Sequence, residues 1–166
     1  MVEYKSDRVI EFGCGDGALL SLLNVNAYIG LDVSATIIKH CISKFKSDNS
    51  KSFFIYDSES FADNLHIFRS DAAFSIDVIF HLVENVVFEK YLEDLFSSAI
   101  KLVVIYGADL DYIPGTEHEL YRKFTVYIEN KYPDWKLEKI IKNRFPLKNY
   151  EDKKGSLSDF YFYIRN

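Results

Sequence analysis

Three glycines at alternate positions follow a short apolar segment near the start of the chain, with an acidic residue just before them. Residues 9–17 read Val-Ile-Glu-Phe-Gly-Cys-Gly-Asp-Gly, so Gly13, Gly15 and Gly17 lie two positions apart and Glu11 precedes them. Glycine has no Cβ atom, which lets a backbone bend sharply and approach a bound molecule closely. The segment therefore predicts a buried strand that ends in a ligand-binding turn.

A nucleotide-binding turn also needs a helix after the glycines and a carboxylate at the end of the next strand. Residues 18–24 read Ala-Leu-Leu-Ser-Leu-Leu-Asn, and residues 27–32 end in Asp32, whose carboxylate can accept hydrogen bonds from both hydroxyls of a ribose. The spacing departs from the G-x-G-x-x-G of a dinucleotide site, and the sequence lacks the G-K-[ST] of a P-loop. Glu11 and Asp16 suit a cationic ligand better than a pyrophosphate.

These two segments resemble the first two motifs of the class I S-adenosylmethionine-dependent methyltransferases; the alternative is a glycine turn in an unrelated α/β protein. The resemblance implies S-adenosylmethionine as the cofactor and gives Asp32 the ribose. It places Asp57 at the adenine amino group, although Asp57 can also be read as a surface acid in a loop. The predicted cofactor-binding residues are Glu11, Gly13, Cys14, Gly15, Gly17, Asp32, Val33, Asp57, Ser58 and Asp77.

A later segment resembles the fourth motif of the same family, whose strand end faces the methyl donor. Residues 72–82 read Ala-Ala-Phe-Ser-Ile-Asp-Val-Ile-Phe-His-Leu. The resemblance puts Asp77 beside the methionine end of the cofactor, where a carboxylate suits an ammonium group. His81 is the imidazole nearest the expected transfer point and is a candidate general base. The alternative is a histidine that organises the loop.

The segment after the fifth expected strand carries the candidates for the substrate side, because loops that follow strands carry specificity. Asp109, Asp111, Tyr112 and His118 lie there, and His118 is also a catalytic candidate. Arg122 follows His118 by four residues, so one helix face can present both side chains, and an arginine there can bind a phosphate or carboxylate. The alternative for Arg122 is an exposed helix cation.

Apolar segments typical of strands alternate with helical patterns along the chain, which predicts a doubly wound α/β sheet. The expected strands are 8–12, 27–32, 52–56, 71–76, 101–106, 136–143 and 159–165. The expected helices are 17–25, 34–47, 60–67, 85–98 and 117–131. No helix separates the last two strands, so they are expected to pair antiparallel. The prediction is a Rossmann-like α/β fold, a seven-stranded sheet with its last strand antiparallel.

Composition narrows the class of protein. The 166 residues fit one domain, 1–166. A net charge of −5 gives no broad basic surface, which disfavours nucleic acid as a partner. The aromatic content of 16% favours an aromatic core over a surface that stacks on bases. The two cysteines lack metal-ligand or C-x-x-C spacing, so no metal is expected, Cys14 is read as a small turn residue, and a reducing cytoplasm is expected.

The sequence therefore predicts a single class I methyltransferase domain that uses S-adenosylmethionine to methylate a small polar molecule. The expected reaction is O-methylation of a sugar or phosphate-type metabolite, with no nucleic-acid or membrane partner. The alternative is a non-catalytic S-adenosylmethionine-binding module that regulates a partner protein. The expected domain begins almost at its first strand, so a lid over the cofactor would come from a second subunit of a homodimer, from a further segment, or be absent.

Overall fold

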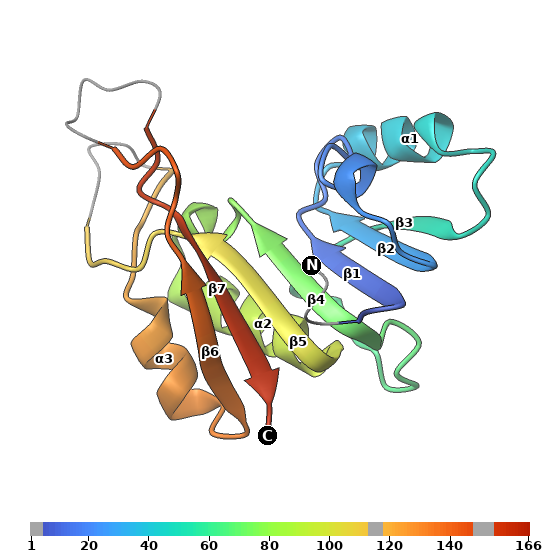
Figure 1. The fold of residues 1–166 in the computed structure, drawn as a ribbon. Helices are drawn as coiled ribbons and strands as arrows, with labels where there is room; N and C mark the ends of the chain where they lie inside the picture. The colour runs from blue at the N-terminus through green and yellow to red at the C-terminus, as the bar shows by residue number, and fades with distance from the viewer. Residues whose placement is uncertain (1–4, 113–117, 148–154) are drawn as a thin grey trace.

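Seven strands form one mixed sheet in the order β3-β2-β1-β4-β5-β7-β6 (Figure 1). The structure is a computed structural model that describes residues 5–112, 118–147 and 155–166. The strands are β1 (Arg8–Phe12), β2 (Ala27–Asp32), β3 (Lys51–Ile55), β4 (Ser70–Ile76), β5 (Ala99–Gly107), β6 (Trp135–Ile141) and β7 (Asp159–Arg165). β7 runs antiparallel to both β5 and β6, while the other neighbours are parallel. This confirms the predicted Rossmann-like α/β sheet.

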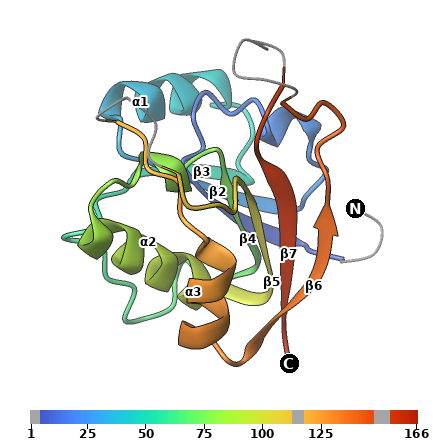
Figure 2. The same cartoon turned by 90° about the vertical axis from the view of Figure 1, so that its left-hand side faces the viewer.

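Helices cover both faces of this sheet. They are α1 (Ala35–Lys44), α2 (Asn85–Ser97) and α3 (Phe124–Lys131), with short 3₁₀ turns η1 (Leu20–Leu22) and η2 (Ile79–His81). Figure 2 looks onto α2 and α3, which pack on one face, whereas α1 packs on the other. Because side chains alternate along a strand, Ile10 and Phe12 of β1 join the core under α2 and α3, while Val9 joins the core under α1.

The predicted helix 17–25 is wrong, because only the 3₁₀ turn η1 forms there. Residues 18–26 must return the chain from the carboxyl end of β1 to the start of β2. Nine residues of α-helix would advance about 14 Å, whereas the six residues of β2 span about 20 Å. The crossover therefore uses a short 3₁₀ turn and then an extended backbone, beginning at Leu23 with ψ 139°.

The predicted helix 60–67 is also wrong, because this connection between β3 and β4 consists of turns. The Asp63 carboxylate accepts hydrogen bonds from the backbone N–H groups of Ile67 and Phe68, at 2.7 and 2.9 Å. His66 has a positive φ of 56°. A side-chain acceptor that takes backbone donors offers the chain an alternative to a helix.

The last predicted helix, 117–131, begins seven residues late, at Phe124 of α3; residue 117 itself lies outside the described residues. Asp109 accepts hydrogen bonds from Thr125 N–H and Thr125 Oγ1, at 3.0 and 2.7 Å. Asp111 accepts a hydrogen bond from Lys123 N–H at 3.1 Å. Asp109 and Asp111, expected on the substrate side, therefore bind the backbone at the start of α3. Within the described residues, no helix is both long and apolar enough to cross a membrane.

Candidate functional site

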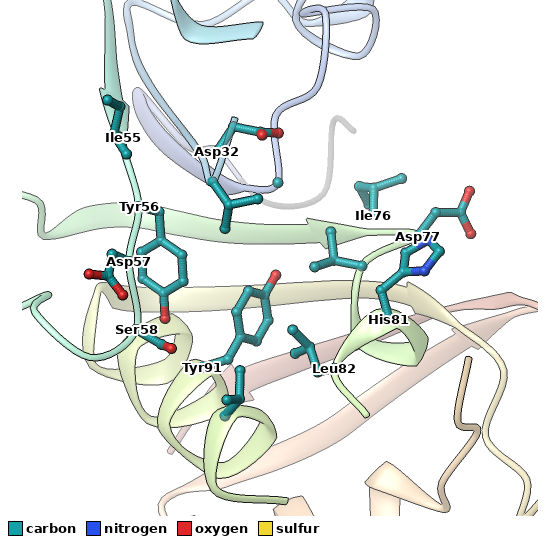
Figure 3. A pocket seen from close by; sticks show the side chains of 14 residues that line it. Asp32, Ile55, Tyr56, Asp57, Ser58, Ile76, Asp77, His81, Leu82 and Tyr91 are labelled. Carbon is teal, nitrogen blue, oxygen red and sulfur yellow. The ribbon is translucent and has the colours of Figure 1, made fainter. Parts of the chain in front are cut away.

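A pocket of about 710 Å³ lies at the carboxyl ends of β1, β2, β3 and β4 (Figure 3). β1 and β4 are neighbours in the sheet, and the helices that follow β2 and β4 pack on opposite faces. Such a topological switch point is where open α/β sheets bind ligands. The fold therefore places the pocket where a nucleotide is expected.

The predicted cofactor residues divide into two groups. Those that line the pocket are Gly13, Asp32, Val33, Asp57, Ser58 and Asp77. Those that are not among its lining residues are Glu11, Cys14, Gly15 and Gly17. His81 also lines the pocket. The second group thus acts on the shape of the turn.

The glycine turn is held by backbone hydrogen bonds to the end of β2. Gly13 N–H and Cys14 N–H both donate to the carbonyl of Leu31, at 2.8 and 2.9 Å. Gly15 N–H donates to Asp32 Oδ2 at 3.0 Å. Ser34 N–H donates to Asp32 Oδ1 at 2.9 Å. Each oxygen of the Asp32 carboxylate therefore has a fixed donor and still has a free lone pair for a ligand hydroxyl.

Two of the glycines are required by their surroundings. Gly13 has φ +78°, and a Cβ there would lie 2.3 Å from Val78 Cγ2. Gly17 has φ +73°, and a Cβ there would lie 2.7 Å from the Phe45 ring. An L side chain rarely adopts this backbone conformation. Gly13 keeps the pocket wall open, whereas Gly17 makes room for an aromatic ring that packs on α1.

Glu11 lies on the α1 side of β1, away from the pocket. It is 2% exposed, and the Tyr28 hydroxyl donates a hydrogen bond to its carboxyl group. Burial raises the pKa of Glu11 to about 7, a hydrogen bond from Tyr28 opposes the shift, and Asp32 adds to it. Glu11 was expected to bind the cofactor, but in the structure it is a buried acid that bonds Tyr28 of β2 and is not among the lining residues of the pocket.

The raised pKa of Glu11 predicts a pH-dependent stability. Glu11 binds its proton more tightly in the folded state, so its contribution is complete below about pH 4.5 and is lost as pH rises through about 7. From pH 5 to pH 8 the wild type should lose on the order of 3 kcal/mol of unfolding free energy relative to Glu11→Gln. Urea denaturation at several pH values measures this difference. The exposed Glu129→Gln is the control, and parallel curves for wild type and Glu11→Gln would contradict the prediction.

Asp77 and His81 lie together at one end of the pocket (Figure 3). Asp77 has φ +56°, and its N–H donates to the carbonyl of Tyr106 at 3.0 Å. Burial raises the pKa of the Asp77 carboxyl, while a hydrogen bond with Ser158 and the nearby His81 oppose the shift. A residue held in the left-handed region next to a pocket is typical of a functional site.

His81 is oriented by the segment that precedes α3. Its Nδ1 lies 3.4 Å from the carbonyl oxygen of His118. A carbonyl oxygen only accepts hydrogen bonds, so a neutral His81 carries its hydrogen on Nδ1 and keeps the lone pair on Nε2. This tautomer leaves one nitrogen able to accept a proton.

At the opposite end of the pocket lie Asp57 and Ser58 (Figure 3). Asp57 accepts hydrogen bonds from Ser60 Oγ at 2.8 Å and Glu59 N–H at 3.0 Å. These two bonds lower the pKa of the Asp57 carboxyl, which keeps it charged. The carboxylate therefore shapes its own turn as well as lining the pocket.

The pocket also has an aromatic wall that the sequence analysis missed. Tyr91 of α2 hydrogen-bonds Ser75 Oγ at 2.7 Å and donates to the carbonyl of Phe12 at 3.2 Å. Its ring contacts Phe12, which also contacts Tyr56. Tyr56 and Tyr91 both line the pocket. Tyr91 lies in the middle of a helix, and nothing in its spacing sets it apart from a core residue.

The expected helix face that carries His118 and Arg122 is wrong, since both residues precede α3. The backbone of Arg122 forms an isolated β-bridge with the backbone of Asp109, so Arg122 is not in a helix. The alternative of an exposed helix cation is therefore wrong as well. Tyr112 pairs with Tyr121 through the backbone, and their rings lie 6.1 Å apart. His118, Tyr112 and Arg122 are not among the lining residues of the pocket.

Charge distinguishes this pocket from an anion site. Its lining includes the three carboxylates of Asp32, Asp57 and Asp77, and its described lining residues include no lysine or arginine. Among the residues that the structure describes, no group of three histidines, cysteines or acids could hold a metal ion. The pocket is therefore built for a ligand that carries positive charge and hydroxyl groups.

Comparisons with known proteins give one kind of match. Neither models of protein families nor curated protein sequences match the chain. Solved structures do match. The methyltransferase domain of bacterial CtHen1-C is 22% identical, with a TM-score of 0.70, over 97% of this chain and 90% of that one.

Two further structures are less similar in sequence but superpose as well. Magnesium protoporphyrin IX methyltransferase from Synechocystis PCC 6803, solved with bound S-adenosylhomocysteine, is 15% identical over 99% of this chain and 77% of that chain, with a TM-score of 0.72. The N-methyltransferase NodS from Bradyrhizobium japonicum WM9 is 12% identical over 99% of this chain and 88% of that chain, with a TM-score of 0.75.

The strand order, the glycine turn and these similarities show that the chain has the fold of the class I S-adenosylmethionine-dependent methyltransferases. The three structures named above are different methyltransferases, so the likeness extends to the fold and not to the acceptor.

Proposed function

We propose that this chain is an S-adenosylmethionine-dependent methyltransferase that acts on a small polar molecule. The observation that carries the proposal is the charge of the pocket, with carboxylates at Asp32, Asp57 and Asp77 and no cationic side chain among its described lining residues. S-adenosylmethionine carries a sulfonium and an ammonium group, which such a pocket attracts, whereas a pyrophosphate would be repelled.

The lining residues fit the parts of this cofactor in order. Asp57 and Ser58 would bind the adenine amino group, and Asp32, whose oxygens each keep a lone pair, would bind the ribose hydroxyls. Asp77 would bind the ammonium group of the methionine part. The cofactor supplies a methyl group on a positively charged sulfur, so the protein mainly has to align the acceptor with it.

For an acceptor hydroxyl, His81 is the proposed general base, because it lines the pocket beside Asp77 and keeps a lone pair on Nε2. Alignment of the two reactants can supply on the order of 7–11 kcal/mol. A hydroxyl group is a weak acid, so it attacks the methyl group faster when a base removes its proton. His81 would be that base.

A neutral acceptor of the sugar type is proposed because the described groups that extend from Asp77, which are not among the lining residues of the pocket, form a hydrogen-bonded network without a cationic side chain. Asn143 Nδ2 donates to the Tyr106 hydroxyl at 2.6 Å, and this hydroxyl donates to Ser156 Oγ at 3.1 Å. Ser158 hydrogen-bonds with Asp77 and so joins this network to the pocket. A phosphate-type acceptor has less support, because the guanidinium of Arg122, its expected anchor, is bound to backbone carbonyls.

The chain is expected to bind S-adenosylmethionine and S-adenosylhomocysteine but not NAD. Asp32, Asp57 and Asp77 favour a cationic adenosine derivative and disfavour a pyrophosphate. Calorimetric titration of the three ligands measures this. Binding of NAD with equal or higher affinity would contradict the assignment.

A screen that detects S-adenosylhomocysteine production then identifies the acceptor. It should include neutral sugar derivatives, sugar phosphates and small RNA, because one of the matched structures is a small RNA methyltransferase, 15% identical with a TM-score of 0.71 over 24% of that chain. Turnover with a neutral sugar supports the proposal. Turnover with RNA alone would overturn the acceptor class, and cofactor binding without turnover would favour a non-catalytic regulatory module.

A further inference from the structure

We propose that Arg122 is a positioning residue for the proposed methyl transfer, and that it acts by holding the wall of the cofactor pocket formed by residues 80–85. The inference rests on the proposed function. The wall connects β4 to α2 and contains both His81 and Leu82, which line the pocket. Arg122 itself is not one of the lining residues.

The guanidinium of Arg122 binds three acceptors in this wall. Its Nη1 donates to the carbonyl of Leu82 at 2.7 Å, and its Nη2 donates to the carbonyl of Val83 at 2.7 Å. Nη2 also donates to Asn85 Oδ1 at 3.0 Å. Hydrogen bonds from a charged donor are stronger than neutral ones, and a planar fork can bind adjacent carbonyls at the same time.

The guanidinium is half-buried between the wall and α2. The group lies over the ring of Phe88 in α2, with its central carbon 4.7 Å from the ring centre. Partial burial of the guanidinium lowers the pKa of Arg122. Arg122 therefore donates hydrogen bonds to backbone carbonyls and makes a cation–π contact with Phe88.

The same segment of chain holds the residues before Leu82. Leu120 N–H donates to the carbonyl of Phe80 at 2.8 Å, and His81 Nδ1 faces the carbonyl of His118 at 3.4 Å. Four consecutive residues of the wall, 80–83, are thus each bonded to a residue between 118 and 122. Arg122 supplies the two bonds nearest to α2.

A lysine cannot replace this arginine. Its single ammonium group is a compact charge on a flexible stem and does not match two adjacent carbonyls in one plane. In Arg122→Lys the wall should leave its pocket-lining conformation for part of the time. The apparent affinity for the cofactor is then the wild-type affinity multiplied by the fraction of molecules whose wall keeps the pocket-lining conformation.

Arg165→Lys is the matched control. Arg165 also lies over an aromatic ring, that of Trp135, at 5.4 Å, but it lies at the last residue of β7, which is antiparallel to β5, and so at the end of the sheet away from the pocket. Hydrogen exchange of the unliganded proteins and calorimetric titration with S-adenosylhomocysteine are measured well below the unfolding midpoint of every variant. Arg122→Lys should exchange the amides of residues 80–88 faster and bind about tenfold more weakly, while Arg165→Lys should match the wild type.

The two measurements separate the explanations. Unchanged exchange and affinity in folded Arg122→Lys, with only a lower unfolding midpoint, would overturn the inference, because that is the result of a purely structural role. A higher KM for the acceptor with unchanged exchange would also overturn it, in favour of direct substrate contact. If Arg122→Lys exchanges faster but the wild type does not bind the cofactor, Arg122 still holds the wall in place. The proposed function would then be rejected.

Discussion

Replacement of His81 by glutamine is expected to lower the methyl-transfer rate by about 10²–10⁴-fold and to leave cofactor affinity nearly unchanged. The hydrogen of a neutral His81 lies on Nδ1, toward the carbonyl of His118, so Nε2 is free to accept a proton. A glutamine amide cannot take a proton at neutral pH. The rate of S-adenosylhomocysteine formation in His81→Gln should therefore lose the pH dependence that a general base gives the wild type.

The control for this experiment is His40→Gln, because His40 is exposed on α1 and should leave rate and profile unchanged. The competing explanation for His81 is that it only organises the wall of the pocket. In that case cofactor affinity and the unfolding temperature of His81→Gln would fall together with activity, and that result would contradict a general base.

Asp32→Ala should weaken the binding of S-adenosylhomocysteine by about a hundredfold or more. Hydrogen bonds to a charged group contribute roughly 1.5–3 kcal/mol each, and the variant loses two to the ribose. It also loses the acceptors for Gly15 N–H and Ser34 N–H, which fix the glycine turn and the start of α1. Calorimetric titration measures the affinity.

Asp32→Asn keeps one carbonyl oxygen and should lose less affinity than Asp32→Ala. Asp134→Ala, at an exposed turn before β6, serves as the control for removing an acid from this chain. Thermal unfolding should show that Asp32→Ala remains folded. Wild-type affinity in folded Asp32→Ala would show that the ribose is bound elsewhere.

The sheet could be predicted because its strands have short-range signals. Each predicted strand overlaps an observed one, and the missing helix before the last strand indicated the antiparallel pair. Period-two burial and short apolar runs are local properties. The order of the strands in the sheet was not predicted, because it depends on contacts between segments far apart in the sequence.

The helices were less predictable because their limits depend on distances and side-chain bonds. Residues 18–24 have the apolar pattern of a helix, but a helix over the whole crossover would be too short to span the length of β2, and the 3₁₀ turn η1 forms instead. At α3, the carboxylates of Asp109 and Asp111 accept hydrogen bonds from backbone N–H groups at the start of the helix. Propensity and periodicity describe neither constraint.

The candidate site was predicted where it lies at strand ends and missed where helices contribute. Each of Asp32, Asp57 and Asp77 lies at or just after the carboxyl end of a strand. The topology alone therefore brings the three residues to the same end of the sheet. Tyr91 reaches the pocket from the middle of α2, and the guanidinium of Arg122 bonds to a segment about forty residues away in sequence. Contacts of this kind arise from packing and have no local pattern.

The crossover between the glycine turn and β2 has nine residues, 18–26, and includes the 3₁₀ turn η1. Deletion of one residue there would pull on Gly17 or unwind η1, whereas an insertion would cost only a small loop entropy. The conformation of the glycine turn is thus under the control of chain length. Insertions and deletions in this crossover are a route by which cofactor affinity can change while every residue that lines the pocket stays the same.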